Sequence, residues 1–107
     1  MKVITIKKDN KNSPLEECFG KAKFFCFVHE DSCKIEFVQN PGKDLIKHSG
    51  KKAVEFLHSK GATSVMSGNY GITVKKMLDR YKIQTVIIPT KYKNLFQILR
   101  KLNHNLS

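Results

Sequence analysis

The second half of the chain alternates twice between a helical apolar pattern and a short strand-like run. Helical spacing runs through Ser49–Lys60 and again from Val74 to Tyr81, and the runs Thr63–Met66 and Gln84–Ile88 have the composition of strands. Strand–helix–strand connections in one sheet are right-handed and join parallel strands. This alternation predicts an α/β fold with a parallel sheet at its centre.

The first half contributes strands without helices between them. Lys2–Lys7 is a short β-branched run, and Lys23–Val28 is apolar at both parities, as in a strand covered on both faces. Lys34–Gln39 alternates in part, which predicts a half-exposed edge strand in a hairpin with its predecessor. The whole order predicts a mixed five-stranded sheet with helices on both faces, built from residues 1–107 as a single domain.

The C-terminal elements are predicted from two apolar segments. Gln84–Ile88 has an unbroken apolar centre, typical of a strand that is internal or capped by helices. A last helix is expected from about Tyr92, with Thr90 as its N-cap, and the tail 103–107 is expected to fray. Its apolar stripe consists of Leu95, Ile98, Leu99 and Leu102.

Charge is distributed unevenly along the sequence. The net charge is +11; residues 1–50 hold nine basic and seven acidic residues, whereas residues 51–107 hold eleven basic and two acidic residues. Such a field attracts nucleic acid, phosphates, organic acids or an anionic metal–sulfur cluster without choosing among them. Solubility alone is an equally good explanation of the charge.

Several function classes find no support in the sequence. No stretch reaches the roughly 20 apolar residues that span a bilayer, and the N-terminal apolar run is too short for a signal peptide. Three cysteines without a Cys-x-x-Cys pair fit a reducing compartment, so a cytoplasmic protein is expected. Carboxylates are scattered and Gly-x-Ser-x-Gly is absent, which argues against hydrolase or nuclease chemistry.

One loop has the features of an anion site. Gly68, Asn69, Tyr70 and Gly71 follow a predicted parallel strand and precede a helix, where free N–H groups and the helix dipole favour negative charge. The loop lacks both the Gly-x-Gly-x-x-Gly and the P-loop patterns, so nucleotide binding is not indicated. The alternative is that its glycines only shape a tight turn.

Two further residues are candidate metal ligands. Cys18 follows the first strand and His48 precedes the first long helix, so both are expected near the carboxyl edge of the sheet, where open α/β sheets bind ligands. A thiolate and an imidazole suit iron and copper chemistry. Alternatively, Cys18 is a small buried apolar residue and His48 a solvated loop residue.

Ordered short motifs along almost the whole chain resemble those of one known family. They are the Lys2-Val3-Ile4 strand, Phe19-Gly20-Lys21-Ala22, the Phe24-Phe25 strand, Asn40-Pro41, His48-Ser49-Gly50, Ala53-Val54-Glu55-Phe56-Leu57, Gly61-Ala62, Ser67-Gly68-Asn69-Tyr70-Gly71 and Lys82-Ile83. In order and spacing they resemble the dinitrogenase iron-molybdenum cofactor biosynthesis family. The resemblance implies a ribonuclease H-like three-layer α/β/α fold with sheet order 3-2-1-4-5 and strand 2 antiparallel.

The same resemblance implies a function. It implies non-covalent, non-enzymatic binding or carriage of an iron-molybdenum or other metal-sulfur cluster, with Cys18 and His48 as metal contacts. Cofactor-binding candidates are Gly68, Asn69, Tyr70, Gly71, Asn40, Ser49 and Gly50. Family members commonly carry His where this chain has Cys18, and Tyr70 is bulky for a glycine-rich loop, where it would narrow the site or stack on a ligand.

Partners follow from the same expectation. They are the cluster itself and cofactor-assembly proteins, with the chain as a monomer or weak homodimer. A basic nucleic-acid-binding module and a metal-independent, partner-binding regulator remain the alternative functions. The first alternative predicts salt-sensitive affinity for RNA or DNA, although no known nucleic-acid-reading motif is present.

Overall fold

The computed structural model describes residues 1–45 and 49–106, with side chains described as far as Leu102. Its five strands form one sheet in the order β3-β2-β1-β4-β5. The strands are β1 (Lys2–Ile6), β2 (Phe24–His29), β3 (Lys34–Gln39), β4 (Ser64–Ser67) and β5 (Gln84–Ile87). β1, β4 and β5 are parallel, and β2 runs antiparallel to both of its neighbours, which confirms the expected topology.

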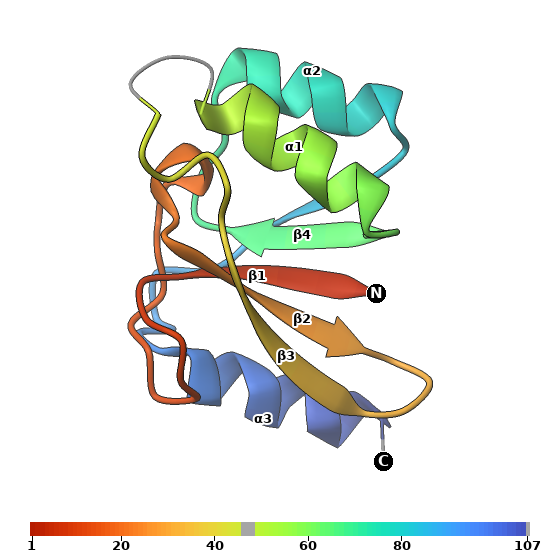
Figure 1. The fold of residues 1–107 in the computed structure, drawn as a ribbon. Helices are drawn as coiled ribbons and strands as arrows, with labels where there is room; N and C mark the ends of the chain where they lie inside the picture. The colour runs from red at the N-terminus through yellow and green to blue at the C-terminus, as the bar shows by residue number, and fades with distance from the viewer. Residues whose placement is uncertain (46–48, 107) are drawn as a thin grey trace.

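Helices cover both faces of the sheet (Figure 1). α1 (Ser49–Ser59) and α2 (Ile72–Arg80) pack on one face, and α3 (Leu95–Leu106) packs on the other. The alternating side chains of the strands therefore supply two separate cores. On the α1/α2 face the core includes Val3, Phe25, Val54, Leu57, Val65 and Leu78. On the α3 face it includes Ile4, Ile6, Cys26, Ile88, Leu95 and Ile98.

The last helix begins later than its predicted start. α3 starts at Leu95 and not at Tyr92, because Asn94 caps it in place of Thr90. The Asn94 Oδ1 accepts the Gln97 N–H at 3.0 Å, and the Gln97 Oε1 accepts the Asn94 N–H at 3.3 Å. This reciprocal pair is a capping box, which fixes the first turn. The backbone of α3 reaches Leu106, into the tail that was expected to fray.

β5 is not internal, in contrast to one of the two predicted arrangements. It is the last strand of the sheet, and α2 contacts it. Ile87 at its end is 59% exposed, so the apolar run is covered only in part. The apolar run Val86-Ile87-Ile88 thus predicted a strand correctly but did not reveal whether the strand was central.

Close contact between α1 and α2 depends on Gly50. A Cβ at Gly50 would lie 2.5 Å from Cγ2 of Val74, well inside van der Waals contact. We expect Gly50→Ala to lower the free energy of unfolding by about 1 kcal/mol, because β-branched Val74 has little rotamer freedom to move away. Urea unfolding of Gly50→Ala and of the Gly50→Ala/Val74→Ala pair measures this. If the two substitutions together cost as much as the sum of Gly50→Ala and Val74→Ala measured separately, the loss of stability does not come from the contact between the two side chains.

Candidate functional site

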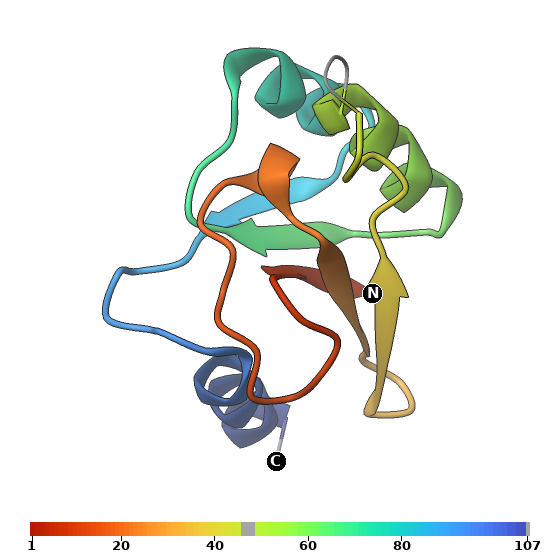
Figure 2. The same cartoon turned by 60° about the vertical axis from the view of Figure 1, so that its left-hand side comes forward.

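Two predicted site segments meet at the carboxyl ends of β1 and β4. Residues 15–18, here called the edge segment, cross this end of the sheet beside the loop that follows β4 (Figure 2). The Asn69 N–H donates to the Glu17 carbonyl oxygen at 2.8 Å, and the Phe19 N–H donates to the Asn69 carbonyl oxygen at 3.2 Å. Cys18 is thereby paired with Asn69 as in a parallel sheet. The structure thus brings Cys18 and the 68–71 loop together.

Buried hydroxyl groups hold the edge segment from beneath. Thr5 and Ser67 are fully buried, and their hydroxyl oxygens lie 2.8 Å apart. The Thr5 hydroxyl also donates to the Glu16 carbonyl oxygen at 2.8 Å, and the Ser67 hydroxyl donates to that of Glu17 at 3.3 Å. These contacts fix the backbone that carries Cys18 to the ends of β1 and β4.

Gly68 lets the edge segment lie this close. A Cβ at Gly68 would stand 2.6 Å from Cγ of Glu17 and 2.7 Å from its carbonyl oxygen. A side chain would therefore collide with the backbone of the edge segment. Gly71, at the other end of the loop, has open space at the corresponding position.

Cys18 is half-buried at this junction, with its backbone N–H donating to Oε2 of Glu16 at 3.1 Å. It immediately precedes η1 (Phe19–Lys21), a single 3₁₀ turn that the sequence patterns did not predict. Phe19 is buried and packs against the rings of Phe25 and Tyr70 at centroid distances of 6.0 and 5.9 Å. A buried aromatic anchor thus fixes the residue next to the thiol.

Two helices start at this edge with no acidic residue in their first turns, although Glu16 and Glu17 lie in the neighbouring edge segment. α2 begins after Gly71 with no side-chain cap, and neither α1 nor α2 carries an acidic residue in its first turn. Lys51 and Lys52 instead lie in the first turn of α1. Free N–H groups and the positive dipole ends of the helices therefore favour an anion here.

The side chain of Tyr70 contributes to the packing of the fold. Its hydroxyl oxygen lies 2.8 Å from the carbonyl oxygens of both Val65 and Val86, between which its one proton is shared, and its ring packs on the α1/α2 core. The Tyr70 hydroxyl is therefore already occupied within the fold.

Alkaline titration tests the burial of Tyr70 and Cys26. Burial raises the pKa of each to about 12, from ordinary values near 10 for tyrosine and 9 for the thiol. The folded protein holds these protons longer than the unfolded chain, so their stabilisation is complete below pH 9 and is lost as the pH rises toward 12. We expect urea midpoints to fall over this window, and Tyr70→Phe to flatten the part above pH 10. If the urea midpoint of Tyr70→Phe falls as steeply above pH 10 as that of the original chain, ionisation of Tyr70 is not the cause of the fall.

The other predicted site residues fall into two groups. Ser49 begins α1 beside η1, since a Cβ at Gly20 would lie 3.9 Å from its Oγ. Asn40 is fully buried, and its side chain is occupied by the Ala22 carbonyl oxygen and the Gly42 N–H, each at 2.8 Å. Asn40 thus shapes the turn after β3, and Gly50 lies against α2 as described above. His48 lies outside the described residues.

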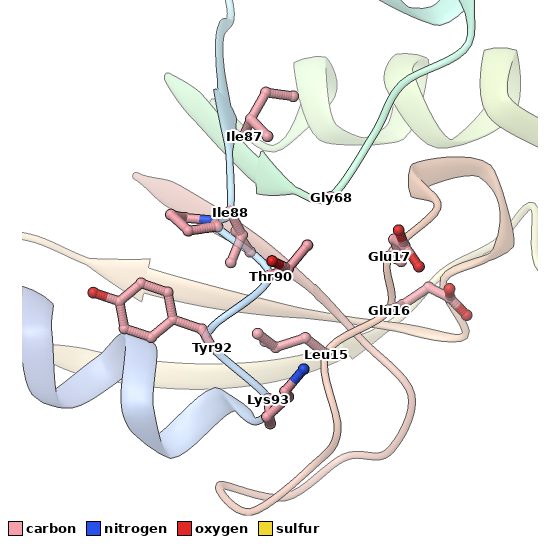
Figure 3. Close-up of a pocket in the computed structure, with 10 residues that line it drawn as sticks. Leu15, Glu16, Glu17, Gly68, Ile87, Ile88, Thr90, Tyr92 and Lys93 are labelled. Atoms are coloured by element: carbon pink, nitrogen blue, oxygen red, sulfur yellow. The ribbon is translucent and has the colours of Figure 1, made fainter.

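A hollow of about 360 Å³, lined in part by Gly68, lies between the edge segment and the chain that follows β5. We call it the edge hollow (Figure 3). One wall is the edge segment, which supplies Glu16 and Glu17, and the other is the chain after β5, which supplies Thr90 and Lys93. The hollow was not predicted from the sequence, because its walls are 70 residues apart along the chain. Its two carboxylates and one ammonium group make it less basic than the chain as a whole.

The donor set limits the kind of metal site. Among the described residues, no three His, Cys, Asp or Glu side chains converge on a point where a metal ion would be held. A cluster ligated by four cysteines would require soft ligands that this edge does not offer. The edge thus offers one cysteine and backbone N–H groups rather than a full set of ligands for a bare metal ion.

Comparison with known protein families decides the relationship. The family model described as dinitrogenase iron-molybdenum cofactor matches residues 1–103. The chain belongs to this family. No curated protein matches significantly. Among the residues that the structure describes, no helix is long and apolar enough to cross a membrane.

Several solved structures have a fold that superposes on most of the chain. The apo form of the orange protein from Desulfovibrio gigas matches with a TM-score of 0.83, 19% identity, and coverage of 98% of this chain and 88% of that one. The protein PH0822 matches with a TM-score of 0.79, 19% identity, and coverage of 97% and 90%. A Thermotoga protein described as a NifB protein of the DUF35 family matches with a TM-score of 0.77, 19% identity, and coverage of 97% of this chain and 86% of that one. At this identity these structures establish the fold alone.

Proposed function

We propose that this protein binds and carries a preformed anionic metal–sulfur cluster, such as an iron-molybdenum cofactor, without catalysing a reaction on it. The observation that carries the proposal is the backbone pairing of Cys18 with Asn69, which places a half-buried cysteine beside the loop that leads into the uncapped start of α2. A thiolate suits iron and molybdenum sulfides, and the helix start suits their negative charge. Membership of the cofactor family supports the same conclusion.

Each group at the edge has a role in this proposal. Cys18 provides the one soft ligand. The N–H groups of the first turn of α2 and of Tyr70 and Gly71 face the cluster's sulfides, whereas that of Asn69 is occupied by the Glu17 carbonyl oxygen. Lys51 and Lys52 add long-range attraction. His48 remains a second proposed metal contact. Three free cysteines support residence in the reducing cytoplasm, where the carrier would meet cofactor-assembly proteins as a monomer or weak homodimer.

Anaerobic titration of the full chain tests the proposal. The probes are iron-molybdenum cofactor, a synthetic iron–sulfur cluster and tetrathiomolybdate, followed by visible absorbance and by metal analysis after gel filtration. We expect saturable binding of at least one cluster at one cluster per chain. Retention of none of them would overturn the proposal.

The same preparation separates the alternatives. Single-stranded RNA and duplex DNA, titrated at low and high salt, report the nucleic-acid-binding function through a steep salt dependence. If the protein binds RNA and no cluster, its function lies in its basic surface and not in the carboxyl edge of the sheet. A stable protein complex without metal would instead favour a partner-binding regulator.

A further inference from the structure

The two edges of the sheet are protected differently. β3, at one edge, carries the exposed charged residues Lys34 and Glu36. β5, at the other edge, has no charged residue within Gln84–Ile87, and within the described chain no strand pairs with its outer side. Charged residues on edge strands prevent unwanted pairing, so β5 is the edge that can accept another strand.

The hydrogen bonds of β5 show which groups are free. The N–H groups of Gln84 and Ile88 donate to Thr63 and Ser67 of the β4 side, each at 2.9 Å. In a parallel ladder the N–H and C=O of alternate residues point to the same side. The N–H and C=O of Thr85 and Ile87 therefore point away from β4 and are available to a strand from outside.

A second hollow, of about 230 Å³, lies beside this edge between β5 and α3, and we call it the flank hollow. Its floor is apolar and includes Met66, Val86, Ile98 and Leu102. Its rim is basic: the Nζ atoms of Lys91 and Lys101 lie 5.2 and 5.6 Å from the centroid of the Tyr92 ring. The flank hollow thus offers room for an apolar side chain beside two ammonium groups.

Charge complementarity identifies the occupant. A second copy of this chain would bring another +11 to a rim that is already basic. We propose that the β5 edge and the flank hollow bind an extended acidic segment of a partner protein. The segment adds a strand through Thr85 and Ile87, places an apolar side chain in the flank hollow, and sets carboxylates near Lys91 and Lys101. This inference is independent of cluster binding.

Nuclear magnetic resonance on the ¹⁵N-labelled full chain tests it. The probe is a capped synthetic peptide of about eight residues, a typical strand length, in which Val and Glu take turns at every second position with Thr between them, so that both face the flank hollow. We expect saturable shifts and slowed amide exchange at Thr85 and Ile87, with affinity that falls as salt is raised. No binding, or shifts centred on β3, would overturn the proposal.

Variants and a charge-swapped peptide complete the test. Ile87→Asp adds a like charge at an exposed position and is expected to weaken binding roughly ten-fold, as is Lys91→Glu combined with Lys101→Glu. Lys34→Glu, the matched change at the β3 edge, is expected to leave the affinity unchanged. Equal affinity of Ile87→Asp, or of a peptide with Lys in place of Glu, would contradict the proposal. So would a dimer of the free chain, seen by sedimentation, that Ile87→Asp abolishes.

Discussion

Gly68→Ala is expected to lower the free energy of unfolding by about 2–3 kcal/mol and to abolish most cluster binding. The new Cβ would meet the Glu17 carbonyl oxygen at 2.7 Å and the Glu17 Cα at 3.0 Å. These are backbone atoms that cannot rotate away, so the edge segment must move off the loop. Cys18 would then lose its place beside Asn69. Urea unfolding and anaerobic tetrathiomolybdate titration measure the two effects.

Gly71→Ala is the matched control, because it makes the same substitution three residues later in the same loop. A Cβ at Gly71 meets nothing within 4 Å, and the backbone there has φ −67°, which any residue adopts. We expect its stability to change by less than about 1 kcal/mol and its cluster affinity to stay close to that of the original chain. If Gly68→Ala and Gly71→Ala behave alike, close approach of the edge segment is not what fixes the site.

Cys18→Ser is expected to weaken cluster binding by about ten-fold or more while leaving the fold intact. The side chain is half-buried and serine is nearly isosteric, so the substitution removes a soft ligand with little effect on packing. The comparison is an anaerobic tetrathiomolybdate titration of Cys18→Ser and Cys33→Ser, with circular dichroism to monitor folding.

Cys33→Ser provides the control because Cys33 is an exposed thiol in the turn between β2 and β3. We expect it to bind the cluster as the original chain does. Equal loss in both variants would indicate nonspecific capture by free thiols, and no loss in Cys18→Ser would remove Cys18 from the site.

The sheet topology and the junction of Cys18 with the 68–71 loop followed from the sequence for different reasons. Apolar periodicity located the strands and helices, since each face of the sheet must be buried. Cys18 and Gly68 were expected at one edge because both follow strands that run the same way. The strand order itself came from the family resemblance, because periodicity does not state which strands are neighbours.

The missed features depend on contacts between distant segments. Nothing local to Phe19–Lys21 predicts a 3₁₀ turn, which is held by Phe19 packing on Phe25 and Tyr70. Similarly, Tyr70 was expected to narrow the site or to stack on a ligand, and nothing in the sequence indicated that its hydroxyl reaches the Val65 and Val86 carbonyl groups. The capping box of Asn94 and Gln97 was also missed, because Thr90 was the expected N-cap, although Asn-x-x-Gln at the start of an apolar stripe is a local signal for it.

The most direct test of the central claim is to locate a bound cluster on the ¹⁵N-labelled chain. Tetrathiomolybdate is diamagnetic, so its titration can be followed at every backbone amide. We expect saturable shifts at Cys18, at residues 68–71 and in the first turn of α2, with little change along β3. Shifts that spread over the exposed lysines, or that leave Cys18 and the loop unchanged, would contradict a cluster site at this edge.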